Sequence, residues 1–108
     1  MKPYINQLWV TWTQEPIKDW LPDNNFTVNY WLEVDVGYED EIGADSFKVL
    51  ILTEDSKRHF NLKKTPPERC LVVPGQYEWS KVEKMVQQVF DSCVSENYLE
   101  FWLFVRNA

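Results

Sequence analysis

The chain has 108 residues, 44% of them hydrophobic and 16% aromatic, and its formal net charge is −6. A chain of this length and composition builds the core of a single domain, residues 1–108, and is too rich in aromatic residues to be disordered. Its negative charge disfavours binding to nucleic acid, and it shows neither a membrane-spanning apolar run nor a signal peptide. We therefore expect a cytoplasmic protein with no nucleic-acid or membrane partner.

The N-terminal third predicts two strands and a connection. Residues 4–13, YINQLWVTWT, mix β-branched and aromatic residues and predict a strand, whereas residues 14–25 predict a connection with a short helical turn starting at Pro16. Residues 26–36 alternate strictly, which is typical of an antiparallel strand. Its apolar face contains Phe26, Val28, Tyr30, Leu32, Val34 and Val36, and its other face contains Thr27, Asn29, Trp31, Glu33 and Asp35.

The middle of the chain predicts a hairpin and two further strands. Residues 47–53, FKVLILT, are apolar on both faces, which indicates a strand buried on both sides. Residues 37–46 would then form the hairpin loop, where Gly37 and Gly43 could supply positive φ angles. Residues 54–68 are polar and predict a loop, and residues 69–74 predict a short strand that stops at Pro74.

The clearest helix follows the strand predicted at residues 69–74. Ser80 and Glu83 have the spacing of a capping box. An apolar stripe of helical period then comprises Val82, Met85, Val86, Val89, Phe90 and Cys93. Residues 95–108 fit a last strand or a second helix. The sequence therefore predicts an α+β fold: a mostly antiparallel sheet of four to five strands with one or two helices packed on it.

Residues suited to catalysis or to metal binding are scarce. His59 is the single histidine and lies in a basic loop, so it is the only imidazole available to activate a cysteine or serine nucleophile. The two cysteines have no zinc or redox spacing and are expected to be buried thiols. Residues 39–45 lack calcium-loop spacing, and the carboxylate pairs lack the deep cleft of a glycosidase. We expect no enzyme activity, no cofactor and no metal.

Acidic residues are concentrated in the first half of the chain, where residues 1–47 contain nine acidic and two basic residues. Residues 37–47, GYEDEIGADSF, could be a solvated hairpin tip or a docking surface for a basic protein. On the polar face of the strand predicted at residues 26–36, Glu33 and Asp35 extend this negative charge and Trp31 adds an indole. This combination favours a docking surface. The candidate binding residues are Trp31, Glu33, Asp35, Glu39, Asp40, Glu41 and Asp45.

Residues 26–94 resemble the immunity protein eight family of bacterial polymorphic-toxin systems. The resemblance rests on the segment LVVPGQYEWSKVEKMV and on Gly37, Gly43, Asp45, Phe47, Thr53, Tyr77, Trp79 and Cys93. The segment EDSKRHF after Thr53 and the tail FWLFVRNA depart from the family pattern. The resemblance implies an antitoxin, a monomer or weak homodimer, that binds and neutralises a cognate secreted or contact-delivered toxin domain. Many such toxins are basic, nucleases among them.

Two other functions remain open at this point. One is an adaptor that self-associates through a sheet edge or through the FWLF tail, which sedimentation would detect. The other is a small-molecule sensor with a pocket built from some of the six tryptophans, which ligand-induced quenching of tryptophan fluorescence would detect.

Overall fold

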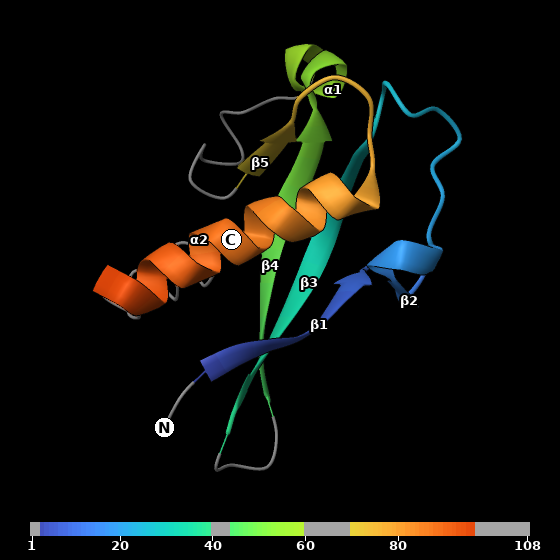
Figure 1. Ribbon diagram of the computed structural model, residues 1–108. Helices are drawn as coiled ribbons and strands as arrows, with labels where there is room; N and C mark the ends of the chain where they lie inside the picture. Colours follow the sequence, from blue (N-terminus) through green and yellow to red (C-terminus); the bar gives the residue numbers. More distant parts are fainter. Residues whose placement is uncertain (1–2, 40–43, 60–69, 97–108) are drawn as a thin grey trace.

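The computed structural model describes residues 3–39, 44–59 and 70–96 of the chain (Figure 1). The elements are β1 (Pro3–Val10), β2 (Glu15–Pro16), a 3-10 turn η1 (Ile17–Asp19), β3 (Asn29–Tyr38), β4 (Ala44–Thr53), α1 (Glu54–His59), β5 (Cys70–Val73) and α2 (Trp79–Glu96). This is the predicted α+β fold, and η1 is the helical turn expected at Pro16. In the described part of the chain, no helix is both long and apolar enough to cross a membrane.

The described strands form a five-stranded sheet in the order β2-β1-β3-β4-β5. The β3–β4 pair is the predicted antiparallel hairpin, the pairs β2–β1 and β1–β3 are antiparallel too, and β4 and β5 are parallel. A parallel neighbour needs a crossover connection, and α1 begins that connection where the sequence predicted a loop. Glu54 and Asp55 lie in the first turn of α1, where negative charge complements the helix dipole. Residues 60–69 lie outside the described residues.

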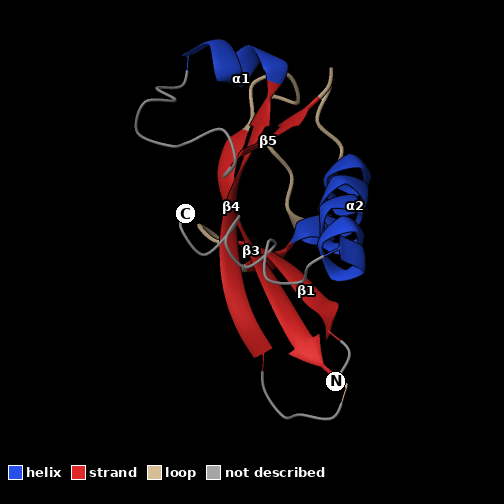
Figure 2. Ribbon diagram, turned by 90° about the vertical axis from the view of Figure 1, so that its left-hand side faces the viewer, coloured by secondary structure: helices blue, strands red, loops and turns tan. Residues whose placement is uncertain are grey.

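The core lies between one face of the sheet and helix α2 (Figure 2). The predicted apolar row of β3 is confirmed for its buried members, Val28, Tyr30, Leu32, Val34 and Val36. The prediction is wrong for Phe26, which is 55% exposed, because β3 begins only at Asn29 and the alternation does not extend through the preceding connection. Leu50 and Leu52 are also buried, opposite Val49 and Ile51, so β4 is buried on both faces as predicted.

Helix α2 presents the predicted apolar stripe to the sheet. Val82, Val86 and Phe90 are buried in the core, with Met85 and Val89 packed against it; the side chain of Cys93 is outside the described residues. The capping-box prediction is wrong, because α2 begins at Trp79 and Ser80 lies inside its first turn. Residues 97–108 lie outside the described residues, and residues 95–96 continue α2.

The β3–β4 hairpin is tighter than predicted, because pairing continues to Gly37 and Ala44. Gly37 does not have a positive φ, so the expected reason for a glycine there is wrong. A Cβ atom at Gly37 would instead come within 2.8 Å of the Tyr4 ring on β1. Gly37 therefore allows the Tyr4 ring to lie against the backbone of β3. Gly43 lies outside the described residues.

Candidate functional site: the outer face of β3

Three of the predicted binding residues form one row on the sheet face that points away from α2. Trp31, Glu33 and Asp35 alternate with the buried core residues of β3, and each is half-buried. We call this row the β3 face. It is flanked by neighbouring strands on both sides: Glu33 is paired with Trp9 of β1 and with Lys48 of β4, and Asp35 is paired with Gln7 and Ser46. The sheet therefore holds an indole and two carboxylates in a fixed order.

Asp35 is tied to both neighbouring strands. Its Oδ2 accepts a hydrogen bond of 3.1 Å from Trp9 Nε1, and its Oδ1 accepts one of 2.7 Å from Ser46 Oγ. Hydrogen bonds to an ionised acceptor are stronger than neutral ones, so this carboxylate fixes the Trp9 indole on the outer face. Asp35 is consequently a structural residue as well as a candidate binding residue.

Glu33 is the carboxylate whose environment is perturbed. Partial burial, followed by the charge and the hydrogen bond of Asp35, raises the pKa of Glu33 above its usual value, and Lys48 opposes this effect. Among the described residues, the ion pair present is Arg58–Asp55 at 3.9 Å on α1, so neither Glu33 nor Asp35 has a salt-bridge partner. Within the described part of the chain, Lys48 is the cation that acts on Glu33, and neither carboxylate forms an ion pair.

Trp31 is held through its backbone. Its carbonyl oxygen accepts hydrogen bonds of 3.0 Å from Thr11 N and 2.7 Å from Thr11 Oγ1. Its cross-strand neighbour on β4 is the buried Leu50. The indole is half-buried at a position whose backbone is fixed, and it borders Glu33 along the row. This arrangement suits a rigid contact residue.

The hairpin residues of the predicted site are described in part. Glu39 is exposed immediately after β3, at the end of the β3 face nearest the hairpin. Asp40 and Glu41 lie outside the described residues. Asp45 belongs to β4, where its backbone is paired with Val36, and its side chain lies outside the described residues. The structure therefore brings together Trp31, Glu33 and Asp35, with Glu39 beyond the strand end.

The structure adds three residues that the sequence reasoning missed: Trp9, Ser46 and Lys48. All three are cross-strand neighbours of the β3 face, and their pairing depends on the hairpin register and on the β-bulge between Ile5 and Gln7. The sequence signal that could have found Ser46 and Lys48 is the alternation of β4, extended back to a tight hairpin. A hollow of about 340 Å³ beside the row is lined by Trp9, Thr11, Gln14 and Glu33, among others.

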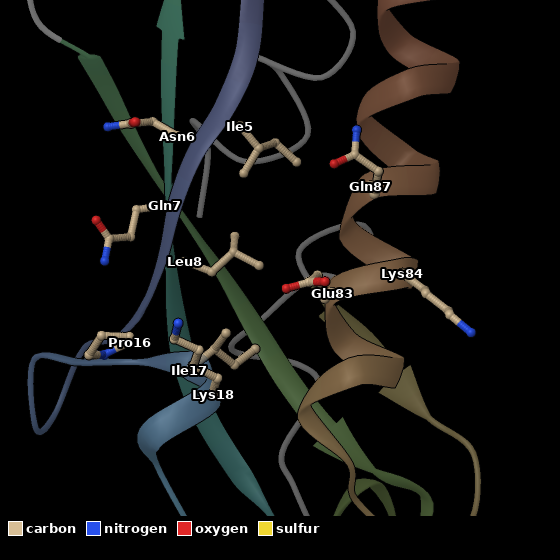
Figure 3. A pocket seen from close by; sticks show the side chains of 10 residues that line it. All are labelled: Ile5, Asn6, Gln7, Leu8, Pro16, Ile17, Lys18, Glu83, Lys84 and Gln87. Atoms are coloured by element: carbon tan, nitrogen blue, oxygen red, sulfur yellow. The ribbon is translucent and has the colours of Figure 1, made fainter.

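A second hollow, of about 640 Å³, lies between β1 and α2 (Figure 3). Ile5, Leu8 and Ile17 form its apolar floor, and Glu83 points toward it from α2. None of its described lining residues is aromatic, so these residues do not form the tryptophan pocket expected of a small-molecule sensor. Within the described residues, no group of three or more His, Cys, Asp or Glu side chains could hold a metal ion.

Fold and face together define a small α+β protein with Trp31, Glu33 and Asp35 in the outward row of β3. The family model Immunity protein 8 matches residues 7–106, and the chain belongs to this family. The match extends the resemblance found over residues 26–94 toward both ends of the chain. Membership makes the protein an immunity protein, whose partner is a toxin. No curated protein and no solved structure matched the chain.

Proposed function

We propose that this immunity protein neutralises a basic toxin domain, such as a nuclease, by binding it stoichiometrically through the β3 face and the adjoining hairpin. Trp31 is the apolar contact, Glu33 and Asp35 bind Lys or Arg side chains of the toxin, and Glu39, Asp40, Glu41 and Asp45 steer its approach. The protein acts as a monomer or weak homodimer in the cytoplasm of the cell that makes the toxin. Inhibition by binding needs no catalytic residue, cofactor or metal.

The observation that carries this proposal is the Glu33–Asp35 carboxylate pair, which has no ion-pair partner among residues 3–39, 44–59 and 70–96. Its charges repel, and burial and Asp35 raise the pKa of Glu33. A Lys or Arg side chain placed between them offsets the repulsion and favours the ionised form of Glu33. Perturbed carboxylates of this kind are concentrated at functional sites, because the fold gains nothing from their repulsion.

The charge distribution supports the same partner. Nine of the 17 acidic residues precede residue 48, with only two basic residues in that part of the chain. A negative field of this kind accelerates encounter with a basic surface and disfavours acidic competitors. Lys48 reduces the field locally, so the recognised surface is a mixture of charges rather than a uniform acidic patch.

The first test is co-expression with the C-terminal domain of the protein encoded immediately upstream, which we call the upstream domain. We expect the upstream domain alone to arrest growth, and this protein to bind it and restore growth. The association rate is then measured for wild type, for Glu33→Lys combined with Glu39→Lys, and for the control Asp91→Lys, which reverses an exposed charge on α2.

The double variant should associate about tenfold more slowly than wild type at low salt, and the difference should shrink as salt screens the charges. Asp91→Lys should associate like wild type. Equal association rates for all three proteins at low salt would rule out the β3 face, and growth arrest that this protein does not relieve would rule out the upstream domain as its toxin.

A further inference from the structure

A second exposed apolar region lies at the end of the sheet where β3 begins. The exposed fractions are 83% for Leu21, 61% for Trp12 and 37% for Trp79. Side chains of this size are costly to leave in water, and Trp is enriched among the residues that anchor protein interfaces. We call Trp12, Trp20, Leu21 and Trp79 the aromatic platform.

The aromatic platform is hollowed on both sides of the connection between η1 and β3. One hollow, of about 440 Å³, includes Trp12 and Asn29, and the other, of about 320 Å³, includes Leu21 and Trp79. Trp20 and Pro22 line both, so the connection forms a ridge between two recesses. Each recess is large enough to accept an apolar side chain of a partner.

The ridge is held in place by contacts beneath it. The Trp20 ring centroid lies 4.8 Å from that of Tyr30 and 5.7 Å from that of Tyr77. Tyr77 N donates a 2.7 Å hydrogen bond to Asn25 O, and Thr53 Oγ1 donates one of 2.7 Å to Phe26 O. A surface already fixed in this way loses little conformational entropy when a partner binds.

Charge identifies the partner that fits these recesses. Asp23 lines one recess and Glu78 the other, both are exposed, and neither recess has a Lys or Arg among its described lining residues. Acidic rims around apolar recesses are complementary to an apolar side chain flanked by basic residues. The platform is also continuous with the β3 face, since Asn29 lines a recess and stands two residues before Trp31 in the same outward row.

We infer that the aromatic platform is a second contact region for the toxin, and that it receives an apolar toxin side chain flanked by Lys or Arg. This inference rests on the proposed function, because it concerns the same partner. The two regions affect different rate constants. The carboxylates of the β3 face accelerate association, and the desolvated aromatic contacts of the platform slow dissociation.

The test measures association and dissociation rates with the purified upstream domain for single variants Trp12→Ser and Leu21→Ser. Both side chains are exposed, so thermal unfolding should stay close to that of wild type. Each variant should dissociate about tenfold faster, with an unchanged association rate and little dependence on salt. Gln88→Ser is the control, because Gln88 is exposed on α2 and lines neither recess. Asp23→Lys and Glu78→Lys should also weaken binding.

The outcomes separate this inference from the proposed function. Normal dissociation of Trp12→Ser and Leu21→Ser, together with slow association of the Glu33→Lys, Glu39→Lys protein, would overturn the platform and leave the β3 face standing. Fast dissociation of the platform variants with normal association of the β3-face variant would support the platform and overturn the β3 face. No binding of wild type to the upstream domain would overturn both.

Discussion

Trp9 and Asp35 are joined across β1 and β3 by an indole–carboxylate hydrogen bond of 3.1 Å. The same carboxylate also accepts from Ser46 on β4, so it connects the three strands that form the outer face. A residue proposed to bind a toxin is thus also part of the scaffold. Substitutions at this position must be designed so that a loss of stability is not mistaken for a loss of recognition.

The first prediction separates these two roles of Asp35. Asp35→Ala leaves Trp9 Nε1 and Ser46 Oγ without their acceptor and should reduce the free energy of unfolding by about 1–2 kcal/mol, since the site is half-buried. Asp35→Asn keeps an acceptor oxygen and should lose less, while still removing the charge. Urea unfolding measures the first effect, and the association rate with the upstream domain measures the second. Equal losses of stability in both variants would contradict a role for the carboxamide oxygen as acceptor.

The second prediction concerns Glu33 and pH. Since burial and Asp35 raise the pKa of Glu33 in the folded state above 4.5, folding favours its protonated form. The stability associated with Glu33 is therefore present at acidic pH and is lost as pH rises through the raised pKa. Glu33→Gln should consequently unfold at a higher temperature than wild type at pH 7, and the difference should vanish below pH 4.5.

The control for Glu33 is Glu39→Gln, which removes an equal charge from an exposed position beyond the strand. This variant should show a smaller change in melting temperature at pH 7. A wild-type protein more stable than Glu33→Gln at pH 7 would show that Lys48, rather than Asp35, dominates the environment of Glu33.

Local periodicity explains which parts of the fold could be predicted. The alternation from Val28 to Val36 and the stripe from Val82 to Phe90 are each set by one buried face, so sequence alone reveals them. The parallel pairing of β5 with β4 has no such local signal, because it depends on the crossover that begins with α1. Helix α1 has no apolar stripe either, because its segment EDSKRH is polar throughout, and the sequence therefore predicts a loop there.

The candidate site was predictable along one strand but not across strands. Trp31, Glu33 and Asp35 were found because a strand has a period of two. Lys48 and Trp9 were not, because their places beside Glu33 depend on the register of two neighbouring strands. The aromatic platform was also missed, since exposed apolar residues in a connection follow no period and only the tertiary contacts of Trp20 show how they are grouped.

The third prediction concerns the buried tyrosine pair under the platform. The hydroxyl oxygens of Tyr30 and Tyr77 are 2.9 Å apart, and burial raises the pKa of each phenol. Tyr30→Phe and Tyr77→Phe should each cost about 1 kcal/mol of stability, and the double variant should cost less than the sum, because both remove one hydrogen bond. Urea unfolding of the four proteins measures this coupling. Additive losses would show that the hydroxyl contact contributes nothing.

The pH dependence of stability gives an independent measure of the burial of Tyr30 and Tyr77. A raised tyrosine pKa means that the associated stability is present below pH 10.0 and is lost as pH rises above it. Wild type should therefore lose stability between about pH 10 and 12 more steeply than the double phenylalanine variant. Parallel pH profiles for the two proteins would contradict the burial of these hydroxyls.

The last prediction concerns Thr53, which anchors the connection beneath the platform. Its buried hydroxyl accepts a 3.0 Å hydrogen bond from Val28 N and donates one of 2.7 Å to Phe26 O. Thr53→Val has nearly the same shape but leaves Val28 N without an acceptor in the interior, so it should cost about 2 kcal/mol. Thr53→Ser keeps the oxygen and should cost only about 0.8 kcal/mol for the lost methyl group.

If Thr53 also fixes the aromatic platform, Thr53→Val should weaken toxin binding more than Thr53→Ser, in the same order as their losses of stability. Thr53→Val, measured at a temperature where it is fully folded, should dissociate faster from the upstream domain than Thr53→Ser does, because the connection must then be ordered on binding. Hydrogen exchange at the amide of Val28 should be accelerated in Thr53→Val and near wild type in Thr53→Ser. Unchanged exchange in Thr53→Val would show that the strand pairing, which continues from Asn29 and Leu52, holds this segment without the hydroxyl.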